Sequence, residues 1–215
     1  MVGLNRRFSP MVRAIKEAIG QNVPCVLNYR VNPGYISRSS WTHDPSEGGG
    51  MLVGEMCHFL DVMQFLVGSR PTTVYASAAS LDSTDIEETD NISVVVSYAN
   101  GSVGTLTYST LGDKRAPKER LEALAGGTLA VLDDFRRLKI SGRQKTIRKR
   151  SANQDKGQLE MLRQTIDAFR GVRATPIVYD ELVDVMKVVF LAQDSVRTGE
   201  VQRISPSIMT MAVAG

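Results

Sequence analysis

His58 is the residue best suited to acid–base chemistry in this chain. It is one of two histidines among 215 residues, and imidazole is the side chain whose ordinary pKa lies closest to neutral pH. Glu55 precedes it by three positions and Asp61 follows by three, so a helix would carry all three on one side. A carboxylate in that position orients an imidazole and tunes its pKa. The spacing predicts a proton-transfer site; the alternative is a structural histidine beside helix-surface charge pairs.

A second group of candidates lies in the long polar stretch that spans residues 32–47. A stretch of this length without periodicity is often functional in a compact domain. Trp41 beside His43 suits carbohydrate binding, although a loop histidine is also commonly just exposed. Arg30, at the end of the preceding strand, suits a carboxylate or phosphate, with a surface salt bridge as the alternative. The predicted substrate contacts are therefore Arg30, Trp41, His43, Glu55 and Asp61.

Three glycines, Gly48–Gly50, introduce the segment that carries His58. Their G-x-G pattern is not read as a dinucleotide fingerprint, because a polar loop precedes it where that motif requires a buried strand. Glycines here are expected to allow close backbone approach, and their N–H groups to suit a hydroxyl or anionic group of a substrate. No cofactor-binding residues are therefore predicted.

The two cysteines, Cys25 and Cys57, have neither C-x-x-C spacing nor a cluster of metal ligands around them. This pattern predicts no metal site and no disulfide, and it indicates a reducing compartment. No apolar run approaches the roughly 20 residues that a membrane span requires, and the first residues resemble no signal peptide. We expect a cytoplasmic protein without a membrane partner.

Periodicity predicts the elements that position these residues. Helices are expected over 10–20, with Ser9 as its cap and Pro10 at its first position, and over 51–68, 157–171 and 181–199. A strand is expected over 23–31, and alternating runs predict six more over 73–80, 91–98, 102–109, 120–126, 128–134 and 138–142. Asn100-Gly101 and Gly126-Gly127 are hairpin signals.

These elements predict an α+β fold: a mostly antiparallel, open-faced meander with helices packed on one face. Apolar side chains on the other face would make a second copy its partner, so a homodimer is expected. The basic run Arg143–Arg150 is interpreted as a solvated strand or hairpin edge. It carries no recognition motif or interleaved aromatics, so no nucleic-acid partner is expected.

Several segments together resemble the C-terminal domain of the Gfo/Idh/MocA oxidoreductases. They are VGLNRRFSP, the pattern GGG-x(7)-H-x-x-D with HDP before it, and the later ERLE and LDDFR. The resemblance extends over about residues 2–204, and it is greatest to the branch associated with polysaccharide biosynthesis. It divides the chain into a domain over residues 1–205 and a tail over 206–215.

The resemblance implies that a Rossmann domain binding NAD or NADP comes first in the full-length enzyme, with a catalytic lysine in a Glu-Lys-Pro motif. His58 matches the family histidine, whereas Gly54 stands where the family commonly has an aspartate. Glu55 is the nearest substitute. The chain would then be the substrate-binding and dimerisation half of an enzyme acting on a sugar, nucleotide sugar or polyol, inactive without its cofactor domain. The alternative is a stand-alone carbohydrate-binding or oligomerisation module without redox activity.

Overall fold

The computed structural model describes residues 2–44, 47–79, 88–142 and 145–205, so the tail expected over 206–215 lies outside the described residues. The described residues form four α-helices: α1 Pro10–Ile19, α2 Cys57–Val67, α3 Gln158–Phe169 and α4 Tyr179–Thr198. The strands are β1 Cys25–Val31, β2 Pro71–Ala78, β3 Asn91–Tyr98, β4 Val103–Ser109, β5 Glu119–Ala125, β6 Thr128–Asp133, β7 Arg137–Ser141, β8 Thr146–Arg150 and β9 Gln202–Arg203. Short helical turns lie at Arg6–Phe8, Trp41–His43 and Glu88–Asp90, and a π-helix spans Leu52–Met56.

The nine strands form one sheet in the order β8-β7-β6-β5-β1-β4-β3-β2-β9. All neighbours are antiparallel except β1 and β4, which run parallel. The α+β class and the mostly antiparallel sheet are confirmed. The prediction of a single meander is wrong, because β1 lies between β4 and β5 and separates two shorter meanders. Such an insertion depends on contacts between distant segments, which local alternation does not reveal.

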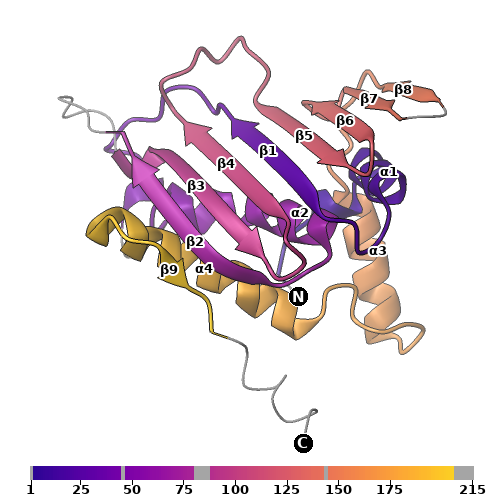
Figure 1. The fold of residues 1–215 in the computed structure, drawn as a ribbon. Coiled ribbons are helices and arrows are strands. Elements are labelled where there is room, and N and C mark those ends of the chain that lie inside the picture. The colour runs from indigo at the N-terminus through magenta and orange to yellow at the C-terminus, as the bar shows by residue number, and fades with distance from the viewer. Residues whose placement is uncertain (1, 45–46, 80–87, 143–144, 206–215) are drawn as a thin grey trace, which may run out of the picture.

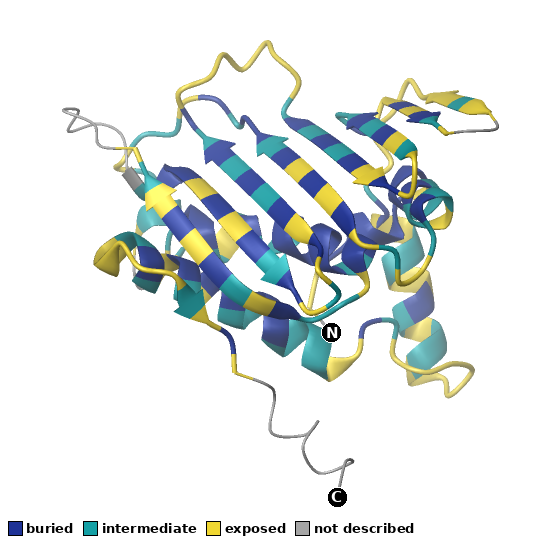
Figure 2. Cartoon of the chain, in the orientation of Figure 1, coloured by how far each residue is buried: buried dark blue, intermediate teal, exposed yellow. Residues whose placement is uncertain are grey.

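The described helices all lie on the same side of the sheet, and the other face is open (Figure 1). Of these helices, α3 packs on the N-terminal residues Arg6–Phe8. Along β1 the side chains of Cys25, Leu27, Tyr29 and Val31 are buried and those between them are not. The same alternation produces the banding of the strands in Figure 2, as expected for a sheet with one covered face. Leu106 points to the helices and is fully buried, whereas Val95 on the neighbouring strand points to the open face.

The core lies between the sheet and the pair α2 and α4. Phe59, Met63 and Leu66 of α2 are completely or almost completely buried, as are Val185 and Val189 of α4. Gly104 of β4 allows this approach, since any side chain there would collide with the end of Met63. The helix that carries His58 is therefore held firmly against the centre of the sheet.

Several helices and turns begin or end at the residues that the sequence predicted. Ser9 accepts a hydrogen bond from the N–H of Met11, and Pro10 begins α1. Gly68 ends α2 in the left-handed conformation, and Gly126 and Gly127 both have positive φ in the turn between β5 and β6. The run at 143–150 contributes the edge strand β8, as expected. Within the described ranges, no helix has the length and apolarity that a membrane crossing demands.

Candidate active site around His58

His58 is the second residue of α2, directly after the π-helix Leu52–Met56. Single π-turns inside helices occur frequently at functional sites. The preceding glycines allow close packing, because a side chain at Gly48 would collide with the backbone of Thr42. The N–H groups of Gly48 and Gly49 are donated to the carbonyl of Asp44, and that of Gly50 to the carbonyl of Thr42. The expectation that these N–H groups bind substrate is therefore wrong: the loop itself uses them.

The imidazole of His58 is half-buried near the start of α2. Burial lowers its pKa below the ordinary 6.5, and the positive charge of Arg6 lowers it further. Glu55 and Glu119 act in the opposite direction but do not reverse the effect. Its Nδ1 atom is buried, and no described residue forms a hydrogen bond with it. An unpaired buried polar atom of this kind is uncommon and calls for an explanation.

Glu55 lies in the same cluster but does not orient the His58 ring as the spacing predicted. Its carboxylate accepts a hydrogen bond of 2.7 Å from the hydroxyl of Tyr108 and one from Nζ of Lys118. Regular helical spacing does not apply across the π-helix, so a separation of three residues no longer aligns Glu55 with His58. Lys118 is partly exposed and lowers the pKa of His58, so the imidazole lies beside both an acidic and a basic side chain.

Glu119 is the buried acid that holds this end of the sheet together. Its two oxygens accept hydrogen bonds from Arg6 at 2.9 and 3.1 Å, from the hydroxyl of Tyr29 at 2.7 Å and from Lys156 at 2.7 Å. Burial alone would raise the pKa of Glu119, but its bonds and charge pairing with Arg6 and Lys156 lower it to about 2. The guanidinium of Arg6 also lies 4.6 Å from the centre of the Phe59 ring. Arg6 is thereby fixed near His58.

Asp61 has a structural partner. Its side chain is completely buried, and its oxygens accept hydrogen bonds of 3.0 and 3.1 Å from Nε of Arg7. Arg7 also bonds Glu181 of α4. We therefore replace the substrate contact predicted for Asp61 with a role in joining α2 to the first residues of the chain and to α4.

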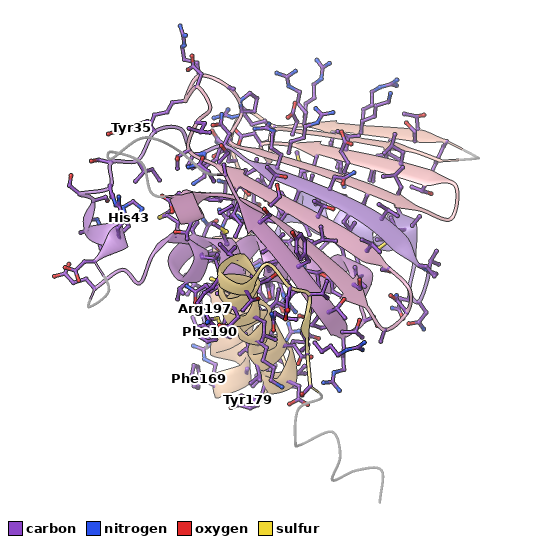
Figure 3. The ribbon with its side chains drawn as sticks, turned by 60° about the vertical axis from the view of Figure 1, so that its left-hand side comes forward. Tyr35, His43, Phe169, Tyr179, Phe190 and Arg197 are labelled. Atoms are coloured by element: carbon purple, nitrogen blue, oxygen red, sulfur yellow. The ribbon has the colours of Figure 1, made fainter. Side chains whose placement is uncertain are left out.

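The two aromatic residues predicted from the polar loop differ in their surroundings. Trp41 is 67% exposed in its short helical turn. The ring of His43 is enclosed: Nε2 lies 2.7 Å from a carboxylate oxygen of Asp90 and Nδ1 lies 3.1 Å from the carbonyl of Ser37. His43 therefore anchors the loop to the turn before β3. In Figure 3, His43 lies at the left-hand side of the molecule, below Tyr35.

Arg30 does not join His58. The neighbouring residues Tyr29 and Val31 face the helices, so Arg30 faces the open side of the sheet. There it lies in a shallow hollow with Asn28, Thr105 and Glu122, and its guanidinium donates to the carbonyl of Pro117. The prediction of Arg30 as a contact on the His58 side is wrong for this geometric reason.

Four residues near His58 were not singled out from the sequence: Arg6, Tyr108, Lys118 and Glu119. Arg6 and Glu119 belong to segments that the sequence analysis used only for the family resemblance. They are 113 positions apart in the sequence, so no local pattern predicts their ion pair. The sequence did contain a signal for Glu119. The residues of β5 that face the helices alternate along the strand, and Glu119 is the charged member of an otherwise apolar set. In the described ranges, no three His, Cys, Asp or Glu side chains gather as metal ligands, and both cysteines are free.

Comparisons with known proteins give the family and the fold of the chain. The family model described as "GFO/IDH/MocA C-terminal domain" matches residues 14–148. Inositol 2-dehydrogenase of Rhizobium meliloti (strain 1021) is 31% identical over 121 residues, which are 51% of this chain and 34% of that protein. Two solved structures have a similar fold. GenD2 from gentamicin A biosynthesis in complex with NAD has a TM-score of 0.72 at 19% identity, and aldose-aldose oxidoreductase from Caulobacter crescentus has 0.75 at 14%.

The chain is thus related in sequence to an inositol 2-dehydrogenase, and it shares its fold with the two solved structures. It belongs to the GFO/IDH/MocA family. It spans 34% of the length of the inositol 2-dehydrogenase. Each of the two solved structures aligns with 94–95% of this chain, which is 63% of the length of that structure.

The Glu119 cluster predicts a specific loss of stability in acid. The folded-state pKa of about 2 lies below the ordinary 4.5. The contribution of Glu119, about 3 kcal/mol, is therefore complete above pH 4.5 and is lost as the pH falls towards 2. Glu119→Gln leaves Arg6 and Lys156 unpaired, so we expect it to lower the free energy of unfolding at pH 7 by about 3–5 kcal/mol.

Urea denaturation at pH 7 and pH 3 measures this effect, and the difference between wild type and Glu119→Gln should narrow by about 2 kcal/mol at pH 3. Glu122→Gln is the matched control, because Glu122 lies on the same strand, faces the open side and pairs with the partly exposed Arg120. It should change stability by less than about 1 kcal/mol. Equal effects of the two substitutions would contradict the role given to Glu119.

Proposed function

We propose that this chain forms the substrate-binding part of a nicotinamide-dependent oxidoreductase that acts on a hydroxyl group of a sugar, nucleotide sugar or polyol. Membership in the family and the likeness to an inositol dehydrogenase support this assignment. The observation that carries it is the half-buried His58, which lies beside Glu55 and Lys118 and whose pKa is lowered by burial and by Arg6. Two unpaired cysteines suit a cytoplasmic protein, and polysaccharide biosynthesis is the proposed context.

In this proposal His58 is the proton relay. A neutral imidazole has one nitrogen free to accept a proton, and it does so near neutral pH. We infer that Nε2 takes the proton of the substrate hydroxyl, because Nδ1 is enclosed by the protein. Lys118 is partly exposed and has N–H groups beyond the one that it donates to Glu55, and these would bind neighbouring hydroxyl groups of the substrate. The exposed ring of Trp41 would supply an apolar surface for a sugar.

The described residues do not fit the dinucleotide itself. The glycine N–H groups at 48–50 are bonded within their own loop, and no buried strand leads into them. When bound, the nicotinamide would accept the hydride from the substrate carbon; the residues that hold it belong to a separate nucleotide-binding domain, in cis or in trans. The isolated chain is therefore expected to be inactive.

Substitution of His58 tests the assignment. The chain is fused behind the nucleotide-binding domain of Rhizobium meliloti inositol 2-dehydrogenase, and reduction of NAD is followed with inositol and a panel of sugars. Because His58 removes the hydroxyl proton, His58→Ala should lower kcat by about 10²–10⁴-fold.

Arg30→Ala is the control for this substitution, since Arg30 lies on the opposite face of the sheet, and it should leave kcat unchanged. An unaltered rate in the His58→Ala fusion would exclude the relay. Tight sugar binding by the unfused chain, without any turnover in the fusion, would instead support the carbohydrate-binding module, which the exposed Trp41 favours as the second candidate.

We also propose that two copies pair through the open face of the sheet. Four apolar side chains between 37% and 51% exposed form a continuous row across β4, β1, β5 and β6: Val103, Val26, Leu124 and Leu129. Val95 and Tyr75 form a second exposed pair on β3 and β2. Apolar rows on an open sheet face suit packing against a second sheet.

Charged substitutions on the open face test this pairing. Val95→Asp or Leu124→Asp would bury an unpaired carboxylate in the interface, so each should convert dimers to monomers in sizing chromatography with light scattering. Phe190→Asp is the control, because Phe190 is exposed on the opposite, helical side. Dimers that persist in both variants would assign the interface to another surface.

A further inference from the structure

The outer side of α3 carries an apolar stripe that nothing in the described chain covers. The exposed fractions are 72% for Leu159, 53% for Leu162, 48% for Ile166, 84% for Phe169 and 73% for Val172. Leu159, Leu162, Ile166 and Phe169 follow one another at spacings of three and four residues, so they lie on one face of α3. Val172 lies just beyond the C-terminal end of the helix. Contiguous apolar surface of this kind marks an interaction site, whereas single exposed apolar residues do not.

The stripe continues into a groove beside the start of α4. This groove has a volume of about 530 Å³ and is bordered by Phe169, Tyr179 and the segment 173–177. In Figure 3, Phe169 and Tyr179 lie close together at the lower end of the molecule, with Phe190 above them. Exposed aromatic side chains bordering a groove are typical anchors of a protein interface.

The position of α3 is fixed although its outer face is free. Lys156 and Asp155, just before the helix, accept hydrogen bonds at their carbonyls from Asn5 and Ser9. Gly157 packs so closely on the backbone of residues 5–9 that a side chain there would collide with it. The inner face of α3 contributes Met161 to a small apolar cluster of Leu4, Phe8 and Ile177. The contacts on the inner side of α3 therefore fix the position of its apolar stripe in the chain alone.

The same small cluster connects α3 to the proposed active site. Cys57, the neighbour of His58, packs against it. A protein domain bound to the stripe of α3 would thus lie next to the end of α2 that carries His58. The proposed function requires a nucleotide-binding domain to approach that end of α2.

We propose that the stripe of α3 and the adjoining groove form the docking surface for the nucleotide-binding domain, so this inference rests on the proposed function. The chain corresponds to 63% of the length of its NAD-bound structural neighbour, and the remainder of that fold has no counterpart in it. Arg163, Arg170 and Arg173 are exposed around the stripe. The partner surface therefore combines apolar side chains with a rim of carboxylates.

The first test uses the chain by itself. Leu162→Glu with Phe169→Glu should leave the melting temperature unchanged and reduce binding of a hydrophobic dye, since these side chains contact solvent. A clear fall in melting temperature would show that they are already packed, which would overturn the proposal. Loss of a dimer on this double substitution would identify a second copy as the occupant and would also overturn it.

The second test compares hydrogen exchange of residues 158–172 in the chain and in the fusion described above. We expect exchange at least tenfold slower in the fusion, with the protection abolished by the double substitution. Leu111→Glu, at an exposed apolar residue on a loop far along the sheet, should retain it. NADH binding by the fusion without protection of α3 would refute the docking surface alone. Protection of α3 without NADH binding would keep the docking surface and refute the cofactor part of the proposed function.

Discussion

The end of this domain that carries His58 depends on the hydrogen bonds and ion pairs of the Glu119 carboxylate. The carboxylate is buried at the first residue of β5 and pairs with Arg6, Lys156 and the hydroxyl of Tyr29, which come from three distant parts of the chain. A buried carboxylate is tolerated only when its charge is matched and its oxygens are bonded. Because Glu119 satisfies both conditions, it fixes the N-terminal residues and the segment before α3 against the central strands.

This arrangement determines the chemistry of His58. Arg6, oriented by Glu119 and the ring of Phe59, is close enough to disfavour the charged form of the imidazole. Lys118 acts in the same direction, while Glu55 is occupied by Lys118 and Tyr108. Burial and the surrounding cations thereby lower the pKa of His58, as the proposed proton relay requires.

Much of the fold followed from local signals, since helix caps, glycine turns and alternation depend on neighbouring residues. The insertion of β1 between β4 and β5 did not, because strand pairing depends on segments about 80 residues apart. His58 and Glu55 were identified from type and spacing, but Arg6 and Lys118 depend on tertiary contacts. Arg30 was assigned to the wrong side although the alternation of Cys25, Leu27, Tyr29 and Val31 already indicated which face of β1 is covered.

The central claim is that His58 is a neutral base at physiological pH, and NMR titration of the imidazole protons tests it most directly. The chain contains two histidines, so His58→Gln identifies the signal of His58 without ambiguity. The account predicts that His58 titrates below the ordinary value of 6.5, and that Arg6→Gln moves its pKa upward. A pKa of His58 at or above the ordinary value would contradict the account, because the ring would then be substantially charged where the mechanism requires an acceptor.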